Sequence, residues 1–258
     1  MQHIQFDIAG QTATITLNRP QVFNSFNRQM ALELQQALDD CAADAGIRAI
    51  FLTGNGKAFC AGQDLQEVSG PDAPSFKTIL GEHYNPIIER LRSIEKPIVC
   101  GVNGVAAGAG ANIALACDIT VAAASASFIQ AFSKIGLIPD SGGTFFLPRL
   151  IGLQKAAALM MLGEKVSAQE AEALGMIYKV LPDENFRDMA IAIAHTLAAM
   201  PTKGLGLTKR LLNSSLANNL QDQLAAEDRC QTEAGQSHDY REGVAAFLEK
   251  RKPVFKGC

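Results

Sequence analysis

Asp140 is the residue of this 258-residue chain whose type and surroundings most directly indicate chemistry. It follows the run 136–139 (GLIP) and precedes 141–144 (SGGT), and two stretches of small residues lie upstream, at 58–65 and 103–112. Small residues let a ligand approach the backbone closely, so two such stretches can place two N–H donors around one oxygen. A carboxylate beside such an oxyanion hole favours proton transfer at a carbon next to a carbonyl.

Each of these features also has a simpler interpretation. The small-residue stretches could be tight turns that pack a helix on a strand. Asp140, which follows Pro139, could be the N-cap of a helix. The two stretches and the carboxylate together favour the catalytic interpretation over the structural one.

Composition places the chain among ordinary globular proteins. Hydrophobic residues make up 48% of it and charged residues 19%, and the net charge of −3 argues against a nucleic-acid binder. The longest small-apolar stretch, 99–128, contains Asn103, Asn112 and Asp118, so no membrane span is predicted. The six cysteines include no C-x-x-C pair and the four histidines are scattered singly. We therefore expect free thiols, no metal site and a cytoplasmic location.

The first 150 residues alternate between strand and helix patterns. The strand patterns lie at 12–17, 47–53, 98–102 and 119–123. Apolar residues recur at helical spacing over 28–43, and 74–92 also reads as helical, with a break or a new start at Pro86. This alternation predicts an α/β fold of stacked β-β-α or β-α units.

The strand signal fades after residue 150 and helix patterns replace it. Ser167 and Glu170 form a capping box for a short helix that closes at Gly175. Four further helices are predicted at 185–199, 201–217, 219–234 and 240–251, the last with Asp239 as its N-cap. We expect a core at 1–195 and a C-terminal helical region at 196–258 that serves oligomerisation and ligand contact.

The chain resembles the enoyl-CoA hydratase/isomerase (crotonase) superfamily over essentially its whole length. The matching pieces, in order, are AFCAGQDL (58–65), PIVCGVNGVAAG (97–108), CDI (117–119), GLIP (136–139), GGT (142–144), LPR (147–149) and EKRKPVF (249–255). The resemblance implies a spiral of β-β-α units with a C-terminal helical layer. It also implies an acyl-CoA substrate without a separate cofactor, and a homotrimer or a dimer of trimers.

The resemblance carries roles over to particular residues of this chain. The oxyanion-hole donors should be the backbone amides of Gln63 and Ala109, and the side chain of Gln63 need not take part. The substrate-binding positions should be Asn24 with its neighbour Ser25, Ala61, Asp64, Leu65 and Gln66. At the C-terminal tail, Lys252 or Lys256 could meet the phosphates of coenzyme A, and Phe255 could cover the adenine.

Departures from the family pattern indicate the reaction. Hydratases of this superfamily use two glutamates, and this chain has Asn112 and Phe132 at the corresponding positions. Neither side chain can activate water, so hydration is disfavoured. Asp140 stands where hydratases have a small residue. A single carboxylate suits an isomerase that moves a proton from the α-carbon to the γ-carbon.

The segment 132–144 resembles the branch of the superfamily that isomerises a ring epoxide in aerobic phenylacetate degradation. The expected reaction converts 2-(1,2-epoxy-1,2-dihydrophenyl)acetyl-CoA to its oxepin thioester. A general Δ3,Δ2-enoyl-CoA isomerase is the alternative. A carbon–halogen hydrolase ranks third, because no histidine is well placed as its general base. A non-catalytic subunit or RNA-binding relative is a hypothesis from a different class, and the acidic pI and Asp140 argue against it.

Overall fold

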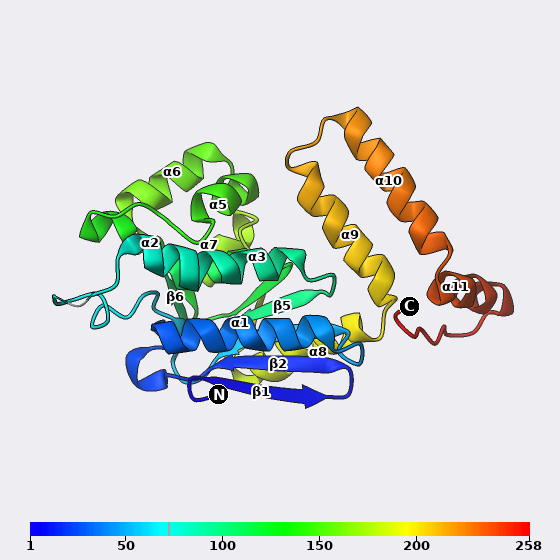
Figure 1. Cartoon of the computed structure of the whole chain (residues 1–258), viewed down its shortest axis with the longest axis horizontal. Coiled ribbons are helices and arrows are strands. Elements are labelled where there is room, and N and C mark those ends of the chain that lie inside the picture. The colour runs from blue at the N-terminus through cyan, green and yellow to red at the C-terminus, as the bar shows by residue number, and fades with distance from the viewer. Residues whose placement is uncertain (72) are drawn as a thin grey trace.

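The computed structural model describes residues 1–71 and 73–258 and contains two β-sheets in its N-terminal part. Figure 1 shows helices on both sides of the larger sheet and a separate group of helices at the C-terminal end. The larger sheet has the strand order β1-β2-β3-β5-β7-β10, and the smaller has the order β4-β6-β8-β9. The strands are β1 (Ile4–Ala9), β2 (Thr12–Leu17), β3 (Ala49–Gly54), β4 (Ala58–Cys60), β5 (Ile98–Val102), β6 (Val105–Ala107), β7 (Ile119–Ala123), β8 (Ser127–Ile129), β9 (Lys165–Ser167) and β10 (Lys179–Leu181).

The chain passes repeatedly from the larger sheet to the smaller one. Strands β3, β5 and β7 are parallel neighbours in the larger sheet, and each is followed after a short turn by β4, β6 or β8 of the smaller sheet. All residues of β3 and β5 are buried, which suits strands covered on both faces. This repetition confirms the predicted spiral of β-β-α units. Strands β9 and β10 lie beyond residue 150, where the strand signal of the sequence fades, because strands of three residues are too short to show an alternating pattern.

The helices follow the predicted pattern closely. Helix α1 spans Arg28–Ala43 as predicted, because the Asn27 side chain accepts a hydrogen bond from the Met30 N–H at 3.0 Å and caps its start. The predicted capping box of Ser167 and Glu170 is present at α7. The remaining helical segments are η1 (Pro20–Val22), α2 (Phe76–Thr78), η2 (Ile79–Tyr84, a π-helix), α3 (Asn85–Ser93), α4 (Ala109–Leu115), η3 (Ala131–Ile135), α5 (Gly143–Ile151), α6 (Leu153–Leu162), α7 (Ala168–Ala173), η4 (Asp183–Asn185), α8 (Phe186–Ala198), α9 (Thr202–Ser215), α10 (Leu220–Gly235) and α11 (His238–Glu249).

Helices α9, α10 and α11 project from the core, whereas α8 packs on strands β3 and β5 of the larger sheet (Figure 1). An ion pair joins α9 to the core: the Nζ of the buried Lys209 lies 2.8 Å from the Oδ2 of the half-buried Asp118. Burial lowers the pKa of Lys209, and the neighbouring Asp118 carboxylate opposes that shift. The division of the chain near residue 195 stays a proposal, and α9 is the first of the projecting helices.

The N-cap of α11 is Ser237, so the assignment of Asp239 as that cap was wrong. The Ser237 Oγ accepts the hydrogen bond of the Tyr240 N–H at 3.0 Å. Asp239 is buried, and its carboxylate instead accepts hydrogen bonds from the backbone N–H groups of Lys256 and Gly257, both at 2.7 Å. Both Ser and Asp are common N-cap residues, so the sequence alone does not distinguish Ser237 from Asp239. In the fold the C-terminal tail binds the Asp239 carboxylate, which leaves Ser237 as the cap.

Candidate active site

A mostly apolar pocket of about 260 Å³ lies where the two small-residue stretches meet the loop of Asp140. Asp140 is the one carboxylate among its described lining residues. The apolar wall consists of Leu65, Val68, Phe76, Ile79, Phe132, Ile135 and Leu137. An apolar cavity with a few convergent polar groups is the usual form of a small-molecule site.

The first small-residue stretch turns the backbone N–H of Gln63 away from the acceptors of the neighbouring backbone. Gly62 has φ of +92°, a conformation that side chains disfavour. The Phe26 N–H donates to the Gly62 carbonyl at 2.7 Å, and the Asp64 N–H donates to the Phe26 carbonyl at 2.8 Å. In such a parallel bridge the intervening N–H points to the opposite side. The Gln63 N–H accordingly has no partner within the part of the chain that the structure describes.

The second small-residue stretch places another N–H donor beside the first, and the described residues offer it no partner either. Gly108 has φ of +54° and ψ of −127°, and Ala109 is the first residue of α4, so its N–H has no intrahelical acceptor. A Cβ added to Gly62 would lie 3.6 Å from the Ala109 nitrogen, which shows that the two stretches touch. Two unused amides against one pocket can stabilise an oxyanion.

Asp140 lies in the loop between η3 and α5 and lines the pocket. The N-cap of α5 is Gly142, and α5 has no side-chain cap, so the interpretation of Asp140 as a helix cap was wrong. Burial raises the pKa of Asp140, while the Ser141 Oγ, which donates to the Asp140 Oδ1 at 2.9 Å, partly opposes that shift. A carboxylate with a raised pKa is a stronger base.

Asn112 supports the backbone of Asp140. Its Nδ2 donates to the Asp140 carbonyl oxygen at 2.8 Å, and its Oδ1 accepts from the Gln130 Nε2 at 2.8 Å. Asn112 is fully buried, and a Cβ on Gly143 would lie 2.4 Å from the Asn112 Nδ2. The position where hydratases of the superfamily have a glutamate is thus occupied here by a donor that holds the Asp140 loop. Phe132, at the other such position, is part of the apolar wall.

Sequence reasoning placed a wall of the pocket between Gly70 and Tyr84, but it did not single out Val68, Phe76, Ile79 or Tyr84 as site residues. Tyr84 lines the pocket and its hydroxyl donates to the Gln63 Oε1 at 2.9 Å. A single tyrosine on an apolar helical face has the pattern of a core residue, so no local signal distinguished it. The Gln63 side chain, which the oxyanion hole does not itself require, is therefore held by a residue of the pocket wall.

The predicted substrate-binding residues differ in what their side chains are free to do. Ala61 and Leu65 are exposed and line the pocket. Asn24 is fully buried, with its side chain bonded to the backbone of Arg19, Asn55 and Ala58. Its part in a binding site would be to shape this loop.

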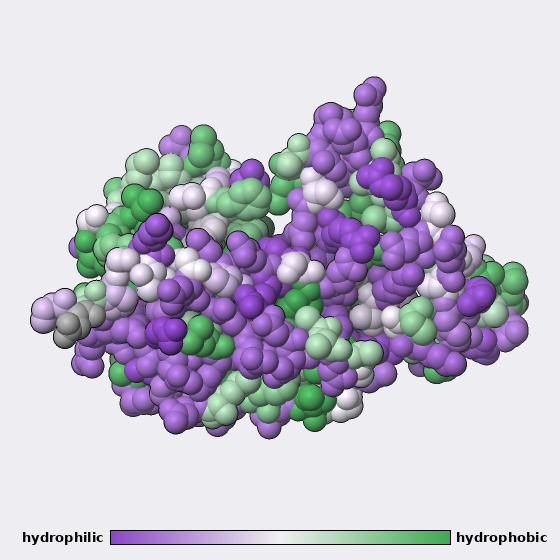
Figure 2. All heavy atoms as spheres, viewed as in Figure 1, coloured by the Kyte–Doolittle hydropathy of each residue, from purple (hydrophilic) through white to green (hydrophobic). Residues whose placement is uncertain are grey.

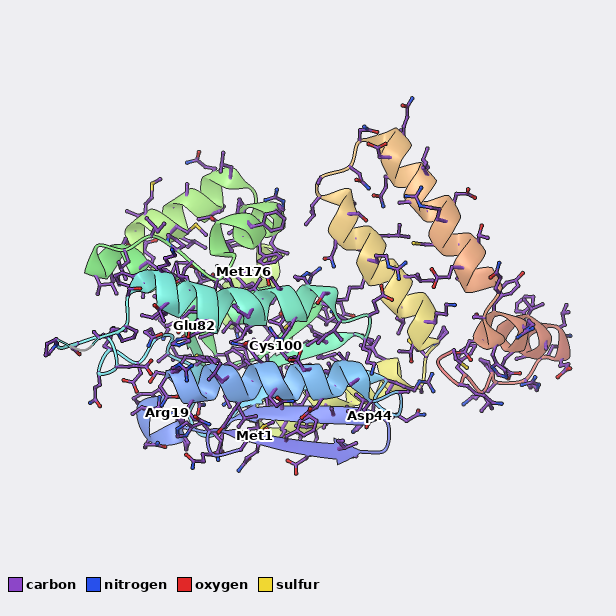
Figure 3. All side chains as sticks on the ribbon, viewed as in Figure 1. Met1, Arg19, Asp44, Glu82, Cys100 and Met176 are labelled. Carbon is purple, nitrogen blue, oxygen red and sulfur yellow. The ribbon has the colours of Figure 1, made fainter. Side chains whose placement is uncertain are left out.

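Asp64 and Gln66 lie next to the pocket. Asp64 forms an ion pair with Arg19 at 2.9 Å, and Figure 3 shows Arg19 at the end of the core far from the C-terminal helices. The Gln66 N–H donates to the Asp64 Oδ1 at 3.1 Å. The Asp64 carboxylate is therefore engaged with protein groups, and contacts with a ligand would fall mainly to the backbone.

The predicted tail residues do not reach this pocket within one chain. Phe255 lines a separate cavity among α9, α10 and α11, and Lys252 follows α11 in the sequence. In Figure 1, α11 lies at the opposite end of the molecule from α2, which contributes to the pocket. A contact between this tail and a ligand in the pocket would therefore have to come from another copy of the chain.

No helix in residues 1–71 and 73–258 has the length and apolar character needed to span a membrane. The same residues contain no cluster of three or more His, Cys, Asp or Glu that could hold a metal ion.

We expect proton abstraction by Asp140 to slow at acidic pH, because protonation of its carboxylate removes the base. The midpoint of this loss should lie above 3.8, the ordinary carboxyl value, because the pKa of Asp140 is raised. The active form is the carboxylate, so kcat/KM should rise with pH through that midpoint and then level off. Ser141→Ala removes a hydrogen bond that lowers the pKa and should move the midpoint further up. Rate profiles of both proteins provide the measurement. A midpoint at or below 3.8, or one unmoved by Ser141→Ala, would contradict this assignment.

Comparison with known proteins agrees with this geometry. Residues 7–258 match the family described as enoyl-CoA hydratase/isomerase. The chain is 48% identical over 261 positions to the 1,2-epoxyphenylacetyl-CoA isomerase of Escherichia coli K12, covering 100% of this chain and 99% of that protein. It is 46% identical to a probable enoyl-CoA hydratase of Rhodobacter capsulatus, covering 98% of each. A crystal structure of a putative enoyl-CoA hydratase/isomerase from Mycobacterium abscessus superposes with a TM-score of 0.92 at 37% identity, covering 98% of each chain.

Proposed function

Because the chain belongs to the enoyl-CoA hydratase/isomerase family, we propose that it is an isomerase of acyl-CoA thioesters. The observation that carries this proposal is the single carboxylate, Asp140, beside the two unused amides of Gln63 and Ala109. Hydration would need a second acid or base at the reacting carbons. Asn112 and Phe132 offer none.

The proposed mechanism moves one proton within the substrate, so the product has the same atoms as the substrate. The thioester oxygen accepts hydrogen bonds from the Gln63 and Ala109 N–H groups. The Asp140 carboxylate removes a proton from the α-carbon, and the electron pair spreads over the thioester and the adjacent double bond as a dienolate. Asp140 then returns the proton to the γ-carbon, which leaves the double bond conjugated with the carbonyl. Coenzyme A is part of the substrate and no separate cofactor is needed.

We propose 2-(1,2-epoxy-1,2-dihydrophenyl)acetyl-CoA as the substrate. The ring bond shared with the epoxide opens to a seven-membered oxepin, and the proton then moves from the α-carbon to a ring carbon. The mostly apolar pocket, with Phe76 and Phe132 in its wall, suits a ring, and the 48% identical relative is named for this substrate. Such an enzyme would act in phenylacetate catabolism. A cytoplasmic location fits the free thiols, five of which are buried.

The experiment that tests this proposal is incubation with the epoxide thioester, with the oxepin thioester followed by mass spectrometry and absorbance. A linear 3-enoyl-CoA assayed alongside tests the alternative, a general Δ3,Δ2-enoyl-CoA isomerase, through the absorbance of the conjugated product. Turnover of neither thioester would favour the non-catalytic subunit. Turnover of the linear thioester alone would favour the alternative.

We expect hydration of crotonyl-CoA to be negligible, because the residues at 112 and 132 cannot transfer protons. The measurement is the loss of enoyl-thioester absorbance with the purified protein, and the isomerase assay on the same preparation is the control. Hydration at an ordinary enzymatic turnover, roughly 10 s⁻¹ or more, would contradict the isomerase proposal.

We further propose that the protein assembles as a homotrimer or a dimer of trimers. Figure 2 shows apolar side chains gathered over α5 and α6, and several are exposed there: Phe145, Leu150, Leu153, Met161 and Leu162. Exposed apolar residues also occur on the projecting helices: Leu212, Leu224, Val244, Phe247 and Leu248. Two different apolar surfaces on one chain can pair head to tail and close into a ring.

Light scattering should therefore give about three or six times the 27.5 kDa of one chain. Burial of the exposed apolar surfaces of α5, α6 and the C-terminal helices would drive this association. Phe247→Glu, on α11, where the side chain is 83% exposed, should shift the mass downwards. Gln5→Glu on the exposed face of β1, outside both apolar surfaces, would serve as a control for added charge. A wild-type mass near 27.5 kDa at micromolar concentration would rule out the proposed assembly.

A further inference from the structure

The side chain of Gln63 is held at both ends. Its Oε1 accepts a hydrogen bond from the Tyr84 hydroxyl at 2.9 Å, and its Nε2 donates to the Glu67 Oε2 at 2.9 Å. The orientation of the amide follows from these partners, because only the nitrogen end can donate to a carboxylate. We refer to Tyr84 and Glu67 together as the Gln63 clamp.

Both residues of the Gln63 clamp are themselves anchored. Tyr84 ends the π-helix η2 and is 1% exposed, and its ring packs against Phe26 with centroids 5.8 Å apart. The Glu67 Oε1 accepts a hydrogen bond from the Arg28 N–H at 2.8 Å, the first amide of α1. π-Helices are rare and occur frequently at functional sites. The clamp thus connects Gln63 to η2 and α1, which belong to the core.

Tyr84 is poorly suited to act as an acid. A phenol has a single hydrogen, and in Tyr84 it is donated to Gln63. Burial raises the pKa of Tyr84 well above its ordinary value, so the hydroxyl stays protonated. Its position at the pocket, with its hydrogen committed to Gln63, therefore points to a role exerted through Gln63.

We propose that Tyr84 and Glu67 are positioning residues that direct the Gln63 N–H at the thioester oxygen. This inference rests on the proposed function. The backbone of Gln63 is held by one isolated bridge to Phe26 and follows Gly62 at positive φ, so the side chain supplies much of its anchoring. An oxyanion donor must lie about 2.7–3.1 Å from the developing charge, and a displacement of about 1 Å can cost about 10²-fold in rate.

The first test is Tyr84→Phe, which keeps the ring and removes the hydroxyl. We expect kcat to fall about tenfold, less than for loss of a whole oxyanion donor, while KM changes less than about threefold. Tyr178→Phe is the matched control, because Tyr178 is 67% exposed and outside the pocket lining. It should leave kcat unchanged.

The second readout is the infrared carbonyl stretch of bound hexanoyl-CoA labelled with ¹³C at the thioester carbon. Wild-type protein should lower this frequency, and Tyr84→Phe should lower it less. Exchange of the α-protons into D₂O, followed by mass spectrometry, should slow in parallel. A residue needed only for stability would lower the melting temperature and leave the carbonyl frequency unchanged.

These readouts separate failure of the clamp from failure of the proposed function. Asp140→Asn should abolish α-proton exchange and keep the carbonyl shift. Gln63→Leu removes both hydrogen bonds of the Gln63 clamp and should cost at least as much as Tyr84→Phe. The double variant should be no slower than Gln63→Leu, because Tyr84 acts only through the Gln63 side chain. A Tyr84→Phe protein with a rate within twofold of wild type and an unchanged carbonyl frequency would overturn the clamp alone. A wild-type protein that shifts no carbonyl would overturn both proposals.

Discussion

Replacing Asp140 with Asn should abolish isomerisation while thioester binding and the fold remain. Asn keeps the size of the side chain but cannot accept a proton. The general-base contribution of about 10²–10⁴ in rate should therefore vanish, and the loss should be larger if Asp140 also returns the proton. The carbonyl of residue 140, which receives the Asn112 and Gly143 hydrogen bonds, is unaffected by this change.

The same substitution should make the protein more stable at neutral pH. The pKa of Asp140 is raised in the folded protein, chiefly by burial. A raised pKa means that the folded state binds this proton more tightly than the unfolded chain, so stability is lost as pH rises through the folded-state pKa. Asn carries no such cost. The gain in melting temperature should shrink as pH falls through the raised folded-state pKa and vanish below 3.8, where Asp is protonated in both states.

The measurement is kcat for Asp140→Asn together with thermal melts at several pH values. Asp188→Asn is the matched control, because Asp188 lies in the first turn of α8, outside the pocket. A kcat within a few-fold of wild type would show that Asp140 is not the base. A destabilised Asn variant would contradict the electrostatic argument while leaving the catalytic one intact.

Asn112→Asp should lower kcat by about 10², with little change in KM, because the base would lose its placement. Asp has the shape of Asn but, when ionised, no N–H to donate to the Asp140 carbonyl. It would also bring a negative charge next to the backbone carbonyl of Asp140 and would oppose ionisation of the base. Neither Asn112 nor Gln130 is part of the pocket lining, so the effect would reach the substrate only through Asp140.

The test compares Asn112→Asp with Asn218→Asp, the same chemical change at a remote turn where the Asn218 Nδ2 donates to the Gln223 Oε1 at 3.0 Å. Gln130→Leu provides a second variant, which leaves the Asn112 Oδ1 without its donor. Both Asn112→Asp and Gln130→Leu should slow the reaction, and Asn218→Asp should not. If folded Asn112→Asp kept a rate within threefold of wild type, Asn112 would have no positioning role.

Features encoded by neighbouring residues could be predicted from the sequence alone. Helix α1 was predicted with its observed bounds because its cap and its apolar period are local. The capping box at Ser167 was readable for the same reason. The two small-residue stretches and Asp140 also stood out, because close backbone approach and proton transfer need particular residue types. The role of each of these features could be proposed from its residue types, but the distances between them could not.

Packing decided the rest, because it joins residues that are far apart in the chain. The hydrogen bond from Asn112 to Asp140 spans 28 positions, and that from Tyr84 to Gln63 spans 21. Neither residue differs locally from an ordinary buried polar or aromatic side chain. Asp239 likewise had a local cap pattern, yet the tail at Lys256 and Gly257 took its carboxylate and left the cap to Ser237. A side chain's partner depends on which elements lie beside it, and only the tertiary fold brings those elements together.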